Sequence, residues 1–192
     1  MNNIITASYK ESLKVKEAFF KKNSVLIARA AETIANAFTS GGKLLIIGNG
    51  GSAADAQHMA AEFVNRFVIE RPPLPAIALT TDSSVLTSIG NDYHFDQVFA
   101  KQVKALGREG DVLLAISTSG NAPNVVNALA VASKGGIKVV GLTGKDGGKM
   151  AKNTDILLNV ESDSTARIQE AHITAGHIIC ELVDNLLFRQ AG

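Results

Sequence analysis

The stretch from Lys43 to Phe67 holds residue types that could bind an anion and move a proton. Its glycine-rich turn, Gly48-Asn49-Gly50-Gly51-Ser52, lies between a short apolar run and a segment from Ala53 onward that favours helix. A turn at the start of a helix presents backbone N–H groups to an anion, at the positive end of the helix dipole. His58 and Glu62 are four residues apart, so their side chains leave the same face of this helix. The stretch therefore offers an anion cradle and, one or two helical turns further on, an imidazole beside a carboxylate.

Both features also have structural interpretations. A histidine and a glutamate four residues apart often form only a solvated contact on a helix surface. Glycines after a strand often serve only the geometry of a tight turn. The turn is not a P-loop, because no Gly-Lys-Ser/Thr follows it.

A dinucleotide site is a further alternative for the same turn. Gly48, Gly50 and Ala53 fit a G-x-G-x-x-A fingerprint, and Glu70 follows at about the 20-residue distance expected of the ribose-binding acid. The next strand-like run begins only at Ala76, so Glu70 is not at the end of a strand. This position disfavours a nicotinamide or flavin site.

A second turn resembles the first. Ser117, Thr118 and Ser119 follow the predicted strand at 111–116 and precede another segment that favours helix. In open parallel sheets, ligands bind outside the carboxyl ends of the strands. Three hydroxyl groups there suit the oxygens of a phosphate monoester, although Ser and Thr are also favoured as plain helix N-caps. Two such turns in one sheet favour the phosphate interpretation.

The last predicted helix carries a further polar pair. Gln169 and His177 are eight residues apart, about two turns, so they lie near the same face. A histidine with neighbours such as Ile173 and Ile178 is more often a core histidine that makes one hydrogen bond than a catalytic residue. His172 lies well round the helix from His177 and receives no predicted role.

The remaining pattern predicts an α/β fold, a single domain over residues 1–192 with a doubly wound, five-stranded parallel sheet. Strands are expected at 44–47, 76–80, 111–116, 138–142 and 155–160, with helices between them and a long last helix at 165–187. A turn is expected at Gly90-Asn91-Asp92. Two helices are predicted before the first strand, one over 3–20 and one that begins at Asn23 or Ser24 and ends at Phe38. Two interpretations are open for these extra helices, within 1–40: a cover on the sheet, or an oligomer-forming arm, which we favour slightly.

Composition and charge exclude several classes of protein. The chain has 192 residues, and its net charge of +1 without a basic block gives no sign of nucleic-acid binding. Cys180 is the only cysteine, so no internal disulfide can form. The first residues lack the pattern of a secretory signal, and no apolar run has the length of a membrane span. We therefore expect a soluble, cytoplasmic protein.

Several short motifs recur along almost the whole chain in a characteristic order. They are Gly48-Asn49-Gly50-Gly51-Ser52, His58 with Glu62, Arg71-Pro72, Gly90-Asn91-Asp92, Gly107-Arg108-Glu109-Gly110-Asp111, Ser117-Thr118-Ser119-Gly120-Asn121, Thr143-Gly144-Lys145-Asp146-Gly147-Gly148 and Arg167-Ile168-Gln169-Glu170. In this order they resemble the motifs of the bacterial phosphoheptose isomerases, within the sugar-isomerase (SIS) group.

The resemblance implies a flavodoxin-like SIS fold, a homotetramer, and conversion of sedoheptulose 7-phosphate to D-glycero-D-manno-heptose 7-phosphate for lipopolysaccharide precursors. It implies a zinc site at His58, Glu62, Gln169 and His177, with Glu62 and His177 as the catalytic acid–base pair. The positions that match substrate contacts are Asn49, Gly50, Gly51, Glu62, Asn91, Asp92, Ser117, Thr118, Ser119 and Gln169. The chain departs from the family pattern at Ala122, often a serine, and at Ala166, often an aspartate.

The same resemblance leaves other functions open. The family includes a non-catalytic tetramer that binds the bacterial replication initiator, and this chain is similar to it around 65–67 and 182–185. A sugar-phosphate-sensing regulator with this fold is a third option. The initiator-binding relatives typically lack an acidic residue at the position that matches Glu62. The carboxylate at this position therefore favours the isomerase.

Overall fold

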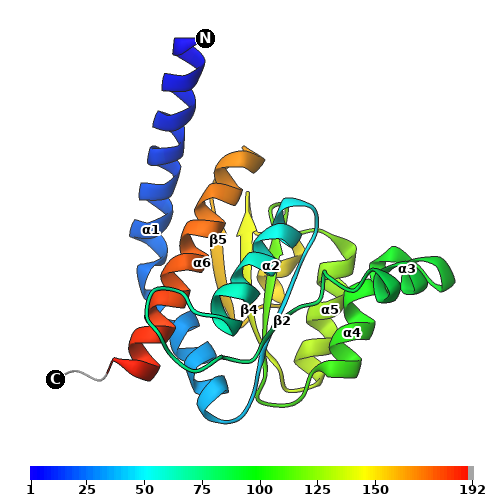
Figure 1. Cartoon of the computed structure of the whole chain (residues 1–192). Coiled ribbons are helices and arrows are strands. Elements are labelled where there is room, and N and C mark those ends of the chain that lie inside the picture. Colours follow the sequence, from blue (N-terminus) through cyan, green and yellow to red (C-terminus); the bar gives the residue numbers. More distant parts are fainter. Residues whose placement is uncertain (190–192) are drawn as a thin grey trace.

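Five parallel strands form the centre of the protein in a computed structural model that describes residues 1–189 (Figure 1). The strands are β1 (Leu44–Gly48), β2 (Ala76–Ala78), β3 (Val112–Ser117), β4 (Lys138–Gly144) and β5 (Ile156–Val160), in the order β2-β1-β3-β4-β5. The chain runs from β1 outward to the edge strand β2 and then returns past β1 to β3. The strand order therefore reverses between β1 and β3, where open α/β sheets bind their ligands.

Helices cover both faces of this sheet. They are α1 (Asn2–Thr39), α2 (Gly51–Val64), α3 (Ser83–Asp92), α4 (Val98–Leu106), α5 (Pro123–Lys134) and α6 (Thr165–Phe188), with short 3-10 segments η1 (Phe95–Gln97) and η2 (Gly148–Lys152). Buried residues of α1, α2 and α6 form one apolar cluster with the sheet, and those of α4 and α5 form a second cluster on its other face. The predicted doubly wound α/β fold is confirmed.

The apolar runs of the sequence form strands whose side chains are buried on both faces of the sheet. In β1, Leu44 and Ile46 join the cluster beneath α1, α2 and α6, whereas Leu45 and Ile47 join the cluster beneath α4 and α5. Successive side chains of a strand point to opposite faces. A parallel sheet covered on both sides therefore has continuous apolar runs instead of an alternating pattern.

The prediction of two helices before the first strand is wrong, because α1 is one continuous helix of 38 residues. Asn23 does not cap a second helix. Its side chain is buried, and its Nδ2 atom donates to the carbonyl of Phe19 one turn earlier. No Gly or Pro interrupts residues 2–39, so nothing forces a break. The helix ends only where Gly41 adopts a φ of +79°.

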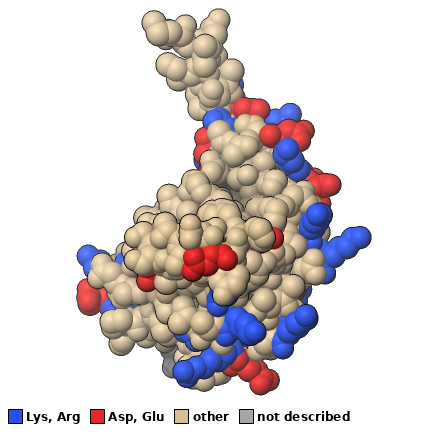
Figure 2. All heavy atoms as spheres, turned by 90° about the vertical axis from the view of Figure 1, so that its right-hand side faces the viewer, with Lys and Arg blue, Asp and Glu red and all other residues tan. Residues whose placement is uncertain are grey.

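The first turns of α1 project beyond the body of the molecule (Figure 1). Residues 1–9 contain no charged side chain, and Figure 2 shows the projecting tip without Lys, Arg, Asp or Glu. Further along, α1 packs against α6 and β5, and the Arg167 guanidinium on α6 donates to the carbonyl of Ser8. Within residues 1–189, none of the helices combines the length and the apolar character that crossing a membrane requires.

Two smaller expectations are also corrected. Gly90-Asn91-Asp92 is not a turn but the last part of α3, which begins after Asp82 caps it by accepting from the N–H of Val85. The second strand is shorter than expected, because pairing of β2 with β1 ends at Ala78. The chain leaves the sheet there, and the segment after Ala78 leads into α3.

Candidate active site

The glycine turn and the serine turn lie side by side at the carboxyl edge of the sheet. Strands β1 and β3 are neighbours, with Gly48 opposite Ile116, so the turns that follow them emerge next to each other. Gly50 has a φ of +55°, a conformation that glycine adopts without strain, and α2 begins at the next residue. The two turns thus lie at the point where the strand order reverses.

Two asparagines join these turns. The Nδ2 atom of Asn49 donates to Asn124 Oδ1 at 2.9 Å, and Asn124 Nδ2 donates back to Asn49 Oδ1 at 2.8 Å. Asn124 is buried at the start of α5. The side chain of Asn49 therefore ties the glycine turn to the start of α5, the helix that follows the serine turn.

The segment after β4 packs against the serine turn and forms hydrogen bonds with it. Gly120, with a φ of +63°, accepts from the backbone N–H of Met150, and a Cβ added to it would lie 2.1 Å from the carbonyl oxygen of Gly147. Asn121 Oδ1 accepts from the N–H of Lys149. Ser117 is buried, while Thr118 and Ser119 are half-buried at the surface of the turn. The close backbone contact explains why the glycine-rich motif after β4 accompanies the serine turn.

The imidazoles of His58 and His177 meet across α2 and α6. Their Nε2 atoms are 2.9 Å apart, so one ring donates and the other accepts. Glu62 Oε1 lies 3.4 Å from the same His58 nitrogen. The structure therefore brings three of the predicted site residues together.

Two neighbours of the imidazoles were not predicted. The Phe67 ring stacks on His177 with centroids 5.5 Å apart. Asp55 lies one turn before His58 on α2, and its Oδ2 atom is buried without a hydrogen-bond partner. Burial raises the pKa of Asp55, and the charges of His58 and His177 oppose this rise. The three-residue spacing of Asp55 and His58 was the available sequence signal, because residues at this spacing share a helix face.

Gln169 lies over the glycine turn. A Cβ added to Gly51 would stand 2.2 Å from Gln169 Nε2, so the amide of Gln169 occupies the space that this glycine leaves open. Gln169 is thus at the N-terminal end of α2, where the predicted anion cradle begins.

A substitution tests this contact. Gly51→Ala should leave the fold intact, because the added methyl group meets only the flexible end of Gln169. It should nevertheless displace that amide from the site and lower kcat/KM by about 10-fold, the effect of losing roughly one hydrogen bond. Steady-state kinetics with thermal unfolding as the control measure both effects, and unchanged kinetics would exclude a role for the contact.

Asn91 and Asp92 are placed elsewhere. They lie on the exposed last turn of α3, where Asn91 Nδ2 donates to Asp92 Oδ1 at 2.9 Å. Figure 1 shows α3 on the right of the molecule, well apart from α6. The structure therefore does not bring these two residues to the imidazole pair within one chain.

Two other titratable residues of α6 are inert. His172 is fully buried, its Nε2 atom pairs with the Thr143 carbonyl, and burial lowers its pKa to about 4. Burial likewise raises the pKa of the Cys180 thiol, with further contributions from Glu62 and Asp184. A thiol that stays protonated is a poor nucleophile. We therefore assign catalysis to neither residue.

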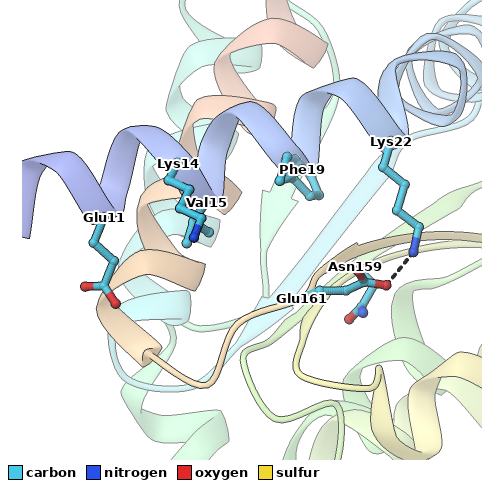
Figure 3. Close-up of a pocket in the computed structure, with 8 residues that line it drawn as sticks. Glu11, Lys14, Val15, Phe19, Lys22, Asn159 and Glu161 are labelled. Atoms are coloured by element: carbon cyan, nitrogen blue, oxygen red, sulfur yellow. Dashed lines mark hydrogen bonds and ion pairs between the residues drawn. The ribbon is translucent and has the colours of Figure 1, made fainter.

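A cavity of about 310 Å³ lies away from this cluster, between α1 and the end of β5. Figure 3 shows Lys22 of α1 reaching Glu161 across it, with Glu11 and Lys14 further along the helix. Two acidic and two basic side chains line the cavity, so it has no net charge to attract a phosphate ester.

The donor types around the imidazoles fit zinc. Imidazole nitrogen and carboxylate oxygen are usual zinc ligands, whereas the amide of Gln169 is not. His58 and His177 converge with Glu62 beside them. In the part of the chain that the structure describes, however, no three or more His, Cys, Asp and Glu side chains are gathered so that they could hold a metal ion.

Comparisons with known proteins show the family of this chain. The family model of the SIS domain matches residues 8–144, which include both turns and α2 but end before α6. A phosphoheptose isomerase from Thermodesulfovibrio yellowstonii is 56% identical over 96% of this chain and 92% of its own length. The solved structure of a phosphoheptose isomerase from Neisseria gonorrhoeae has a TM-score of 0.91 at 48% identity and covers 96% of this chain and 98% of that one. The solved structure of a phosphoheptose isomerase from Francisella tularensis has a TM-score of 0.92 at 42% identity. It covers 95% of this chain and 97% of that one. Together with the turns and the imidazole pair, these similarities show that the chain belongs to the phosphoheptose isomerases of the SIS-domain family.

Proposed function

We propose that this protein isomerises sedoheptulose 7-phosphate to D-glycero-D-manno-heptose 7-phosphate. The observation that carries the proposal is the meeting of Glu62, His58 and His177 beside two turns suited to a phosphate. Relatives at 50–57% identity that bear the name phosphoheptose isomerase support it. The same relatives disfavour a non-catalytic, initiator-binding tetramer. The product would supply heptose for lipopolysaccharide and related surface glycans, a cytoplasmic step.

The reaction moves a carbonyl group from C2 to C1 of the sugar. One proton leaves C1 while the C2 oxygen gains one, which gives an enediol. The C1 hydroxyl then loses its proton and C2 receives one, so no atoms are gained or lost. Glu62 and His177 share these transfers, and each general acid or base typically contributes a factor of about 10² to 10⁴. His58 contacts both residues and keeps them in one place.

The two turns hold the phosphate in this proposal. The hydroxyls of Ser117, Thr118 and Ser119 and the N-terminal end of α2 supply neutral donors to its oxygens. Asn49 ties the glycine turn to the start of α5 through Asn124. A neutral cradle binds the ester and also releases the product.

Incubation of the purified protein with sedoheptulose 7-phosphate, followed by NMR of the products, tests the function directly. The expected result is an aldose signal whose coupling constants identify the manno configuration. An aldose of another configuration would revise the product. No turnover at all would overturn the isomerase and favour a binding module.

We extend the proposal to one zinc ion per subunit, held by His58, Glu62, Gln169 and His177. When bound, zinc supplies Lewis-acid polarisation of the substrate carbonyl. Protein prepared without chelator should contain about one zinc per chain by elemental analysis, and His58→Ala should lose most of it. Wild type without metal and without any gain of activity on zinc addition would refute this assignment.

We also propose a homotetramer with dihedral symmetry. The projecting tip of α1 carries no charged side chain (Figure 2). It exposes Ile4, Ile5 and Tyr9, and Leu13 is exposed about one turn further along the helix. Apolar surface of this kind in a soluble protein marks an interface. Light scattering at micromolar concentration should give the mass of four chains, whereas a monomer would contradict the proposal.

A further inference from the structure

A buried ion pair joins the segment after α2 to α6. Arg71 Nε donates to Asp184 Oδ1 at 2.8 Å, and both side chains are at most 5% exposed. An arginine is almost never buried without a partner. Arg71 and Asp184 therefore form a buried, hydrogen-bonded ion pair in the interior, and neither residue belongs to the imidazole cluster.

The same guanidinium holds the end of α2. Its Nη1 atom donates to the Phe63 carbonyl at 2.6 Å, and its Nη2 atom donates to the carbonyl of Glu62 at 2.8 Å. The last carbonyls of a helix lack partners within the helix, and a cation there also complements the helix dipole. Arg71 therefore binds the backbone of Glu62 itself while it is anchored to Asp184.

These contacts connect the two helices that carry the reacting groups. Glu62 and His58 are on α2, and His177 is on α6, seven residues or about two turns before Asp184, on a similar face. The helices also approach closely beside the imidazoles, since a Cβ on Gly176 would lie 2.8 Å from Met59 Sδ. One contact thus lies at the imidazoles, and the Arg71–Asp184 pair fixes the same helices nearer their C-terminal ends.

We propose that Arg71 and Asp184 are positioning residues, which hold α2 against α6 so that Glu62 and His58 meet His177 in the geometry for proton transfer. This inference rests on the proposed isomerase function. Misplacement of a reacting group by about 1 Å can cost on the order of 100-fold in rate. A shift of α2 along α6 would produce such a misplacement without changing any reacting side chain.

The central test is Arg71→Lys. A single ammonium keeps the charge but cannot reach Asp184 and two backbone carbonyls together, because it lacks the planar fork of the guanidinium. We expect kcat to fall about 10-fold or more, because transition-state geometry is lost. KM should change less than about twofold, because the phosphate turns are untouched.

A matched control separates positioning from stability. Asp111 is also buried and ion-paired, with Lys43, and it accepts from the N–H groups of Lys43 and Arg108. It lies immediately before β3, at the amino ends of the parallel strands, whereas the site lies at their carboxyl ends. Asp111→Asn should lower the unfolding temperature but leave kcat of the folded protein unchanged. An equal loss of kcat in both variants would mean that the pair acts only through stability.

The double variant Arg71→Met with Asp184→Leu keeps the test decisive if single variants fold poorly. Apolar replacement of both partners often restores the stability of a buried ion pair. It cannot restore the hydrogen bonds to the carbonyls of Glu62 and Phe63. A stable protein with reduced kcat supports positioning, and wild-type kcat overturns it.

Crystal structures distinguish failure of this inference from failure of the isomerase assignment. The Arg71→Lys structure should show the His58 Nε2–His177 Nε2 separation displaced from its 2.9 Å. An unchanged separation overturns the positioning role whatever the activity. A wild-type enzyme without turnover, with the separation changed in the variant, refutes the isomerase but keeps the structural role of the pair.

Discussion

Glu62→Gln should lower turnover at least ~100-fold, because the amide keeps the shape of the side chain but cannot accept a proton at neutral pH. Glu62 is partly exposed, and its carboxylate contacts only His58 among the imidazoles. Thermal stability and assembly should therefore change little. Initial rates with sedoheptulose 7-phosphate, together with thermal unfolding and light scattering of the same sample, measure these effects.

Glu70→Gln is the matched control. Glu70 lies in the connector after α2, its side chain is 89% exposed, and its partner is Arg66. The same chemical change there should leave kcat within about twofold, since exposed ion pairs contribute little. If Glu62→Gln is as active as wild type, the catalytic assignment of Glu62 is wrong.

Acid should destabilise the protein through His172. Burial lowers the pKa of His172 from 6.5 to about 4, so between these values the unfolded chain binds a proton that the folded chain excludes. This contribution to stability is complete above pH 6.5 and is lost as the pH falls toward 4. Each pKa unit corresponds to about 1.4 kcal/mol, so the total loss is about 3 kcal/mol. Urea unfolding at a fixed protein concentration, at several pH values across this window, measures it.

His172→Gln removes the titrating ring but leaves an amide donor for the Thr143 carbonyl. Its stability should decline less steeply than that of wild type between pH 6.5 and 4. His94→Gln serves as the matched control, because it makes the same substitution at an exposed position before η1. Parallel slopes for wild type and His172→Gln would show that another group causes the acid sensitivity.

The residue types within each short segment were enough to predict most of the fold. The runs that begin at Leu44 and Val112 are apolar on both faces, as a covered parallel strand requires, and the small residues after them favour a turn into the next helix. The prediction of a second helix that begins at Asn23 was wrong. Asparagine is a preferred N-cap residue, and the sequence does not show that this one is buried. Burial against α6 and the sheet decided instead for a continuous helix.

The two helix faces that form the site were each predicted from the sequence, but their meeting was not. Helical periodicity gave the faces that carry His58 with Glu62 and Gln169 with His177, but not the contact of residues 119 positions apart. That contact depends on how closely α2 and α6 approach, which Gly176 and Arg71 determine. The link between Asn49 and Asn124 was beyond prediction for the same reason, since it follows from the adjacency of β1 and β3.

The packing of α1 along α6 has a consequence for synthesis on the ribosome. Phe19, Ile27 and Ile34 of the first helix are buried in the same cluster as Ile168 and Ile179 of the last. Helix α1 therefore leaves the ribosome long before its partner α6 has been synthesised. Contacts between such distant segments slow folding, and apolar surface left uncovered in the meantime promotes aggregation. Nascent chains that stop before Thr165 should accordingly depend on a chaperone that covers the apolar stripe of α1.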